Sequence, residues 1–269
     1  MKIYDIFCDA SVTNHMRGAC AGALATERYS QNSRLYAVIQ PNGTNNSGEI
    51  CGILQGVLVA IEIKRQSPEP CRFNIFSDSI ISIRGVREWM FHWIYNANAN
   101  HNNMLMSYSG TPVANQLYFK IIFNNIILNN IELYFYHQKG HVEGKYQNVA
   151  NLFEKNNGIS LMRLGLTPEY ISTFNNYVDG RTRDILRQYF DQGHISMSGV
   201  TFDPIANTKY EDITKNMPIP VIQVDGDQPT DAESANFAML NGKNIIAKYA
   251  ELIHAFEYPS ANRIRKYIS

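Results

Sequence analysis

The chain has 269 residues, which is enough for one large domain or two smaller ones, each with a substantial core. Hydrophobic residues make up 45% and charged residues 18%, a composition typical of a soluble globular protein. The 24 basic residues balance the 24 acidic ones, which excludes the overall basic excess of many nucleic-acid binders, so any basic surface must be local.

Four cysteines lie in apolar runs near the start of the chain, without CxxC spacing: Cys8, Cys20, Cys51 and Cys71. We interpret them as buried free thiols of a reducing compartment, and not as zinc ligands or a disulfide framework. The N-terminal segment is typical of a strand and not of a signal peptide. No run approaches 18 apolar residues, so we expect no membrane span and a cytoplasmic location.

The first part of the chain predicts three strands and then strands that alternate with helices. Residues 2–9, 19–27 and 34–40 are apolar and rich in strand formers, and Asn, Arg and Ser lie in the turns. Helices are expected over 49–65, 79–95, 112–128 and 144–155, and strands over 73–76 and 131–136. This order predicts an α/β fold with a mixed five-stranded sheet, three antiparallel strands followed by parallel ones, flanked by helices.

The character of the sequence changes after Gly158. Residues 160–200 predict two or three short helices, 200–229 short strands or an extended connector, and 231–257 one or two helices. We therefore divide the chain into an α/β domain over 1–158 and a mainly helical domain over 159–269. Three roles are open for the second domain: it could bind a protein partner, mediate self-association or extend the nucleic-acid surface.

Three acidic residues lie where strands end or a helix begins. Asp9 ends the first strand, Glu49 opens the first helix and Asp78 ends the fourth strand, and ligands gather at the carboxyl ends of such strands. Clustered carboxylates repel one another unless cations lie between them, and hard oxygen ligands favour Mg²⁺ or Mn²⁺ over zinc. Taken singly, each residue has a plainer explanation as a turn, cap or helix-dipole residue, so the prediction depends on the combination.

Four segments resemble bacterial ribonuclease H, in the same order along the chain. The residues that carry the resemblance are Asp9-Ala10-Ser11, the T-N-N-x-x-E pattern from Thr44 to Glu49, Ser77-Asp78-Ser79, and Lys139-Gly140-His141. The resemblance implies a ribonuclease H-like fold for 1–158. It also implies an endonuclease that hydrolyses the RNA strand of RNA–DNA hybrids with two Mg²⁺ ions, for which Mn²⁺ could substitute.

The resemblance also implies roles for individual residues. Asp9, Glu49 and Asp78 would be catalytic metal ligands, and His141 would assist proton transfer or product release, although an exposed loop residue is the plainer interpretation. Five short polar side chains would hold the hybrid's backbone and sense its 2′-hydroxyl groups: Ser11, Thr44, Asn45, Asn46 and Asn115.

One position departs from the family's pattern. The family's fourth carboxylate lies ten residues after the loop histidine, and this chain has Asn151 there. An amide oxygen can still ligate a metal without bringing charge, so we expect weaker metal binding and weaker or no catalysis. Either Asn151 is an introduced substitution of a natural Asp, or it is natural and the protein is a weakened or non-cutting relative. Glu154, about one helical turn away, could substitute.

A second departure concerns the grip on nucleic acid. Many bacterial members carry a basic segment around 88–109, but this chain has no Lys or Arg over 96–109. Basic residues later in the chain could bind the nucleic acid instead, although scattered surface charge is the plainer interpretation. These residues are Arg163, Arg181, Arg183, Arg187 and Lys209. Two alternatives to the leading function remain, namely a nuclease of this fold acting on other duplexes and a catalytically silent hybrid-binding or scaffolding module. A role in replication would fit either activity.

Overall fold

A computed structural model describes residues 1–13, 18–30, 32–99, 104–140, 146–192, 200–202 and 245–268. They form two compact units, one of Met1–Ile83 with Leu133–Thr208 and one of Arg84–Glu132 with Lys209–Ser269. These units do not follow the predicted boundary after residue 158, because residues on both sides of it contact the same sheet. The partner or self-association expected of 159–269 stays a prediction.

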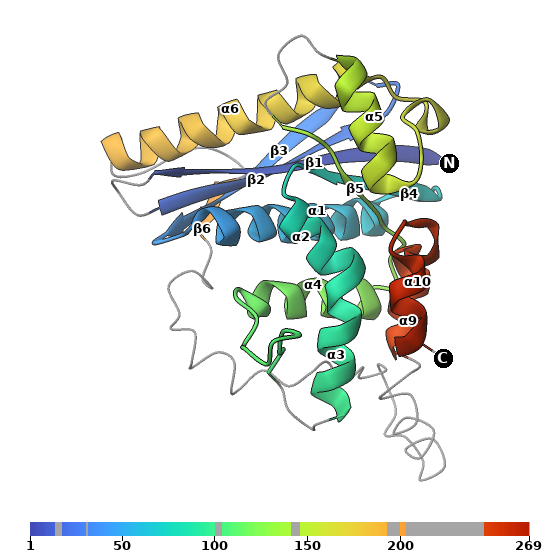
Figure 1. The fold of residues 1–269 in the computed structure, drawn as a ribbon. Helices are drawn as coiled ribbons and strands as arrows, with labels where there is room; N and C mark the ends of the chain where they lie inside the picture. Colours follow the sequence, from blue (N-terminus) through green and yellow to red (C-terminus); the bar gives the residue numbers. More distant parts are fainter. Residues whose placement is uncertain are drawn as a thin grey trace. The chain divides into compact units, whose positions relative to one another are not determined.

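The first unit is built on a six-stranded mixed sheet in the order β5-β4-β1-β2-β3-β6 (Figure 1). Strands β1, β2 and β3 pair antiparallel, and β4, β5 and β6 pair parallel to their neighbours. This arrangement confirms the predicted fold and adds a sixth strand within the stretch expected to hold short strands or a connector. The strands are β1 Lys2–Thr13, β2 Gly18–Glu27, β3 Ser33–Pro41, β4 Cys71–Ser77, β5 Tyr134–His137 and β6 Val200–Phe202.

Strand β2 explains how helices can cover both faces of this sheet. Its sequence, GACAGALATE, is made largely of small residues, and nine of its ten positions are buried. A strand covered on both faces loses the alternation of apolar and polar residues, as is seen here. All four cysteines are free, and Cys8, Cys20 and Cys51 are buried while Cys71 is half-buried, which confirms the prediction of free thiols.

Helix α1, Asn45–Gln66, covers one face of the sheet and begins at a capping box. The Thr44 side chain accepts a hydrogen bond from the Ser47 backbone N–H at 3.2 Å, and the Ser47 hydroxyl accepts one from the Thr44 N–H at 2.8 Å. These bonds satisfy N–H groups that a helix start leaves unpaired. The helix is long and apolar enough to cross a membrane by length and hydropathy alone, but 72% of its most apolar window is buried inside the protein.

Three glycines along α1 allow the helix to lie close to the strands beneath it. A Cβ atom added to Gly48 would lie 2.8 Å from Cβ of Ala10, and one added to Gly56 would lie 2.7 Å from Sγ of Cys8. A Cβ added to Gly52 would approach the backbone oxygen of Asp9 to 3.3 Å. These glycines, four residues apart, therefore fix the distance between the start of α1 and strand β1.

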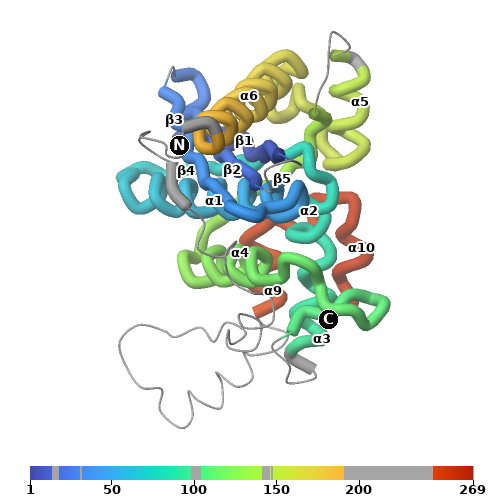
Figure 2. The backbone as a smooth tube through the Cα atoms, turned by 90° about the vertical axis from the view of Figure 1, so that its left-hand side faces the viewer, coloured from blue at the N-terminus to red at the C-terminus, as the bar shows by residue number. Residues whose placement is uncertain are grey.

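Helix α6, Pro168–Gln192, covers the opposite face of the sheet from α1 (Figure 2). It is one helix of 25 residues, so the prediction of two or three short helices is wrong here. Gly180 lies inside this helix, and no atom lies within 4 Å of a Cβ added there. Beside α6 lies helix α5, Tyr146–Asn157, which was predicted over 144–155 and which sets Phe153 against Phe76 and Tyr136.

The second unit is helical, and Tyr249 lies at its centre. The ring of Tyr249, on α9 (Ile245–Leu252), lies 5.4 Å from Phe91 of α3 (Met90–Ala99) and 4.8 Å from Phe123 of α4 (Gln116–Leu128). Its hydroxyl donates to the Val86 carbonyl oxygen at 2.9 Å. The residues near the C-terminus therefore pack on the segment that lies between β4 and β5 in the sequence, which is why no boundary at 158 separates the units.

Candidate metal centre

Asp9 and Asp78 lie beside one another because of the register between β1 and β4. The last parallel pair joins Cys8 to Ser77, so each aspartate is the next residue on its strand. The sequence analysis placed Asp9 at the end of this strand. Strand β1 instead continues to Thr13 by pairing with β2, so Asp9 lies within it. Strand β4 ends at Ser77, which leaves Asp78 at the carboxyl end of the sheet.

Glu49 reaches the two aspartates from the first turns of α1. The close approach of that helix at Gly48 and Gly52 brings the Glu49 carboxylate over strand β1. Ligand atoms of Asp9, Glu49 and Asp78 all lie within 4.8 Å of one another. The structure thus brings together the three carboxylates that the sequence analysis selected as metal ligands.

Burial and the neighbouring negative charges raise the pKa of both Asp9 and Glu49. Asp9 is 5% exposed and Glu49 is 8% exposed. Burial, and then the charge of Asp78, raise the pKa of Asp9 to about 8, and a hydrogen bond from the Ala10 N–H at 2.7 Å opposes the shift. Burial, and then the charges of Asp9 and Asp78, raise the pKa of Glu49 to about 9.

The donor set fits a divalent cation with a preference for oxygen ligands. Among the described residues, Glu49 Oε2 is buried and has no hydrogen-bond partner. Such an atom costs free energy unless a ligand satisfies it, and a cation between the carboxylates would also remove their repulsion. Asp9, Glu49 and Asp78 could therefore hold Mg²⁺ or Mn²⁺.

Gly140, from the Lys139-Gly140-His141 segment, lies against this centre. A Cβ atom at position 140 would overlap the Asp78 carboxylate, so only glycine allows the backbone to lie this close to Asp78. His141 itself lies outside the described residues, and its expected role in proton transfer stays a prediction.

The cluster opens into a cavity of about 360 Å³. Asn45 and Asn46 line it and are exposed, and their expected contact with substrate stays a prediction. Thr44 instead serves as the cap of α1, and its expected contact with substrate is untested. Asn115 belongs to the second unit, where it precedes α4 in a left-handed conformation with φ of 56°.

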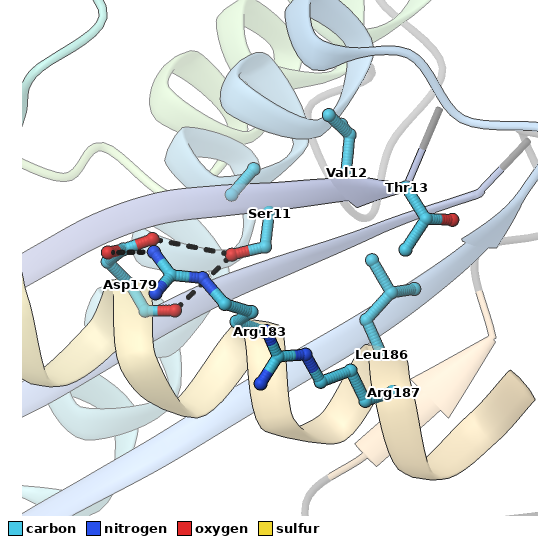
Figure 3. A pocket seen from close by; sticks show the side chains of 8 residues that line it. Ser11, Val12, Thr13, Asp179, Arg183, Leu186 and Arg187 are labelled. Carbon is cyan, nitrogen blue, oxygen red and sulfur yellow. Dashed lines mark hydrogen bonds and ion pairs between the residues drawn. The ribbon is translucent and has the colours of Figure 1, made fainter. Parts of the chain in front are cut away.

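Ser11 is turned toward α6 (Figure 3). Its side chain is buried, and its hydroxyl shares a 2.9 Å hydrogen bond with the Thr182 hydroxyl and donates to the Asp179 carbonyl oxygen at 3.3 Å. The observed role of Ser11 is therefore to join strand β1 to helix α6. Its expected contact with substrate stays a prediction.

Asn151 is exposed on α5 and is not among the residues that line the carboxylate cavity. Glu154, the expected substitute, is also exposed and is likewise not among those lining residues. Asp179 of α6 does line the cavity, and its charge contributes to raising the pKa of both Asp9 and Glu49. The sequence analysis missed Asp179, because its segment was expected to form several short helices.

Asp179 also lines a second cavity, of about 330 Å³ (Figure 3). Arg183 and Arg187 of α6 line it together with β1 residues from Ala10 to Thr13. They are two of the five basic residues proposed from sequence as a grip on nucleic acid. Of the other three, Arg163 and Arg181 do not line either cavity, and Lys209 lies outside the described residues.

A family model described as RNase H matches residues 1–152. Ribonuclease H and ribonuclease HI proteins of Campylobacter jejuni are 27% identical to this chain over 94 residues, which is 35% of this chain and 58% of those relatives. The chain therefore spans less than two thirds of the length of the curated relatives that it matches.

Solved structures show weaker similarity. A foamy viral protease-reverse transcriptase in complex with double-stranded DNA is 15% identical with a TM-score of 0.39, over 57% of this chain and 89% of that chain. LC9-RNase H1, a type 1 enzyme with the type 2 active-site motif, is 17% identical with a TM-score of 0.37, over 56% and 70% of the two chains. With TM-scores this low, the family model remains the basis for assigning a family.

Proposed function

Because the chain belongs to the ribonuclease H family, we propose that it hydrolyses the RNA strand of RNA–DNA hybrids as a metal-dependent endonuclease. The observation that carries this proposal is the buried cluster of Asp9, Glu49 and Asp78, whose ligand atoms lie within 4.8 Å of one another. All three residues lie inside the segment that matches the family.

In the proposed reaction these three carboxylates hold two divalent cations, Mg²⁺ or Mn²⁺. Such ions, when bound, activate a water molecule and stabilise the leaving 3′ oxygen of a phosphodiester. The Ala10 N–H orients the Asp9 carboxylate, and Asn45 and Asn46 present amide groups at the mouth of the cavity. Those amides suit contacts with 2′-hydroxyl groups, which distinguish RNA from DNA without reading bases.

The test is to incubate the protein and an Asp9→Asn variant with a labelled RNA–DNA hybrid and Mg²⁺ or Mn²⁺. Single-stranded RNA, duplex RNA and duplex DNA serve as competing substrates. The proposal requires that the protein cut only the RNA of the hybrid, leaving 3′-hydroxyl and 5′-phosphate ends, and that Asp9→Asn reduce cutting by at least about 100-fold. Cutting of another duplex would instead identify a nuclease with a different substrate.

Asn151 favours a second candidate, a hybrid-binding or scaffolding module that does not cut. Asn151 occupies the position where the family resemblance implies a carboxylate, so loss of charge there could silence the site. This candidate predicts that the protein binds hybrid without cutting it, and that Asn151→Asp creates activity. Cutting by the unmodified protein would exclude it.

A further inference from the structure

The place implied for a fourth carboxylate holds Asn151, an exposed amide on α5. We propose that Asp179, on helix α6, supplies the fourth carboxylate ligand of the metal centre. This inference rests on the proposed function, since it assumes that Asp9, Glu49 and Asp78 hold cations. It goes beyond the family match, because residue 179 lies outside the matched segment 1–152.

The first argument is the path of α6 along β1. The Tyr170 hydroxyl donates to Asp5 at 3.1 Å near the start of the helix, and the Thr182 hydroxyl bonds to Ser11 at 2.9 Å further along. The twelve residues from Tyr170 to Thr182 rise about 18 Å along the helix, and the six residues from Asp5 to Ser11 rise about 20 Å along the strand. The helix and the strand therefore run side by side in the same direction over this length. Asp9 lies two thirds of the way from Asp5 to Ser11, and the helical position opposite it is therefore about 178.

The second argument is the face of the strand. Side chains alternate between the two faces of a strand. Asp5, Phe7 and Ser11 all contact α6, with the Phe7 ring stacked 5.1 Å from Phe174, so Asp9 faces α6 as well. Asp179 lines the cavity that contains Asp9, Glu49 and Asp78, which agrees with this placement.

The third argument is how close α6 comes to the sheet at this level. Gly22 of β2 is the cross-strand partner of Asp9. A Cβ atom at Gly22 would lie 2.6 Å from Cγ2 of Thr182 and 3.1 Å from Cγ1 of Val178. Glycine at this position therefore lets the turn of helix that carries Asp179 lie directly against the strand pair that carries Asp9.

The present partners of Asp179 are compatible with a role as a metal ligand. Its Oδ2 accepts from Arg183 at 2.5 Å, and its Oδ1 is 3.5 Å from the Ser11 hydroxyl (Figure 3). The Arg183 side chain is 47% exposed, and ion pairs near the surface contribute only about 0–1 kcal/mol. A divalent cation can therefore replace Arg183 as the partner of Asp179 at little cost.

The test measures Mn²⁺ binding by calorimetry for the unmodified protein and for Asp179→Asn. We expect Asp179→Asn to lose one bound ion or to weaken Mn²⁺ binding by at least about 10-fold, as loss of a metal contact does. The matched control is Asp184→Asn on the same helix, because that side chain is 53% exposed and lines neither cavity. Asp184→Asn should bind Mn²⁺ like the unmodified protein.

Asn151→Asp separates the two candidate positions. If Asp179 is the fourth ligand, Asn151→Asp should change Mn²⁺ affinity by less than about 2-fold. The inference is overturned if Asp179→Asn binds as many ions with the same affinity as the unmodified protein, or if Asn151→Asp raises affinity 10-fold. If the unmodified protein binds no Mn²⁺, both this inference and the proposed function fail. If it binds Mn²⁺ and Asp179→Asn has no effect, this inference alone fails.

Discussion

Asp9 and Asp78 lie at the same level of the neighbouring parallel strands β1 and β4, directly after the paired residues Cys8 and Ser77. Neighbouring strands lie about 4.8 Å apart, and ligand atoms of Asp9 and Asp78 lie within 4.8 Å of each other. The register of the sheet therefore sets the spacing of Asp9 and Asp78. The helices on its two faces add Glu49 from α1 and Asp179 from α6.

The first prediction concerns stability against pH in a metal-chelating buffer. The unfolded chain releases the Asp9 and Glu49 protons near pH 4, whereas the folded protein keeps them until about pH 8 and about pH 9. Between about pH 4 and about pH 9 the folded state therefore binds more protons than the unfolded chain. The protonated Asp9 and Glu49 side chains contribute fully to the free energy of unfolding below about pH 4, and this contribution is lost as the pH rises to about 9. Urea unfolding at pH 5, 7 and 8.5 measures the decline, which should be smaller in Glu49→Gln. An equal decline in both proteins would contradict the prediction.

The second prediction follows from the same groups. Cations bind the ionised carboxylates, so loading the site at pH 7 should release protons. Calorimetric titration of Mn²⁺ in buffers of different ionisation enthalpy counts the protons released, and Mn²⁺ affinity should rise with pH between 6 and 9. A binding enthalpy that is independent of the buffer would show that Asp9 and Glu49 are already ionised.

The third prediction concerns the glycines of α1. Gly48→Ala would place Cβ 2.8 Å from Cβ of Ala10, where neither atom can rotate away. Overpacking of about 1–3 kcal/mol outweighs the helix-propensity gain of about 1 kcal/mol, so we expect lower stability and weaker Mn²⁺ binding through displaced Glu49. Gly180→Ala is the control, because its Cβ would meet no atom within 4 Å. That variant should gain about 0.5–1 kcal/mol in chemical denaturation.

The fourth prediction concerns Ser11, which joins β1 to α6. Ser11→Ala removes the hydrogen bond to Thr182 and should lower the free energy of unfolding by about 1 kcal/mol. Thr13→Val is the control, since the Thr13 hydroxyl is buried and has no partner among the described residues. If Ser11→Ala raises KM for hybrid and leaves thermal stability unchanged, Ser11 acts on substrate and not on the fold.

The fifth prediction concerns the buried ion pair of Asp5 and Arg28. Arg28 donates twice to the Asp5 carboxylate, at 2.8 and 2.6 Å, and both side chains are nearly fully buried. Asp5→Asn leaves the guanidinium charge uncompensated and should cost about 3–5 kcal/mol. Glu27→Gln breaks the more exposed pair with Lys2 and should cost less than about 1 kcal/mol in the same urea titration. A similar cost for both variants would contradict this account.

Local patterns in the sequence were sufficient to predict the sheet and the three carboxylates. The strand and helix periodicities are local, and Asp9, Glu49 and Asp78 lie in or directly after segments whose type the neighbouring residues decide. Register then follows from burial, because one face of each strand must meet a helix. These features therefore need no knowledge of distant parts of the chain.

Features that depend on distant contacts were missed. Asp179 and Ser11 are 168 positions apart, and nothing local indicates that they meet. The segment 160–200 was expected to form two or three short helices, but α6 is continuous over Pro168–Gln192, because its packing on the sheet outweighs the modest helix penalty of Gly180. Tyr249 likewise gives no local sign that its helix packs with Phe91 and Phe123 instead of forming one domain with α6.

Helix α6 also affects the order in which the protein can assemble during its synthesis. Strand β1 is synthesised before α6, and Asp179 on that helix follows Ser11 on β1 by 168 positions. At roughly 5–20 residues per second, the apolar face around Phe7 stays uncovered for about 10–30 s. The nascent chain therefore exposes an apolar surface that chaperones can bind during that interval, and the carboxylate cavity can form only after α6 has been synthesised.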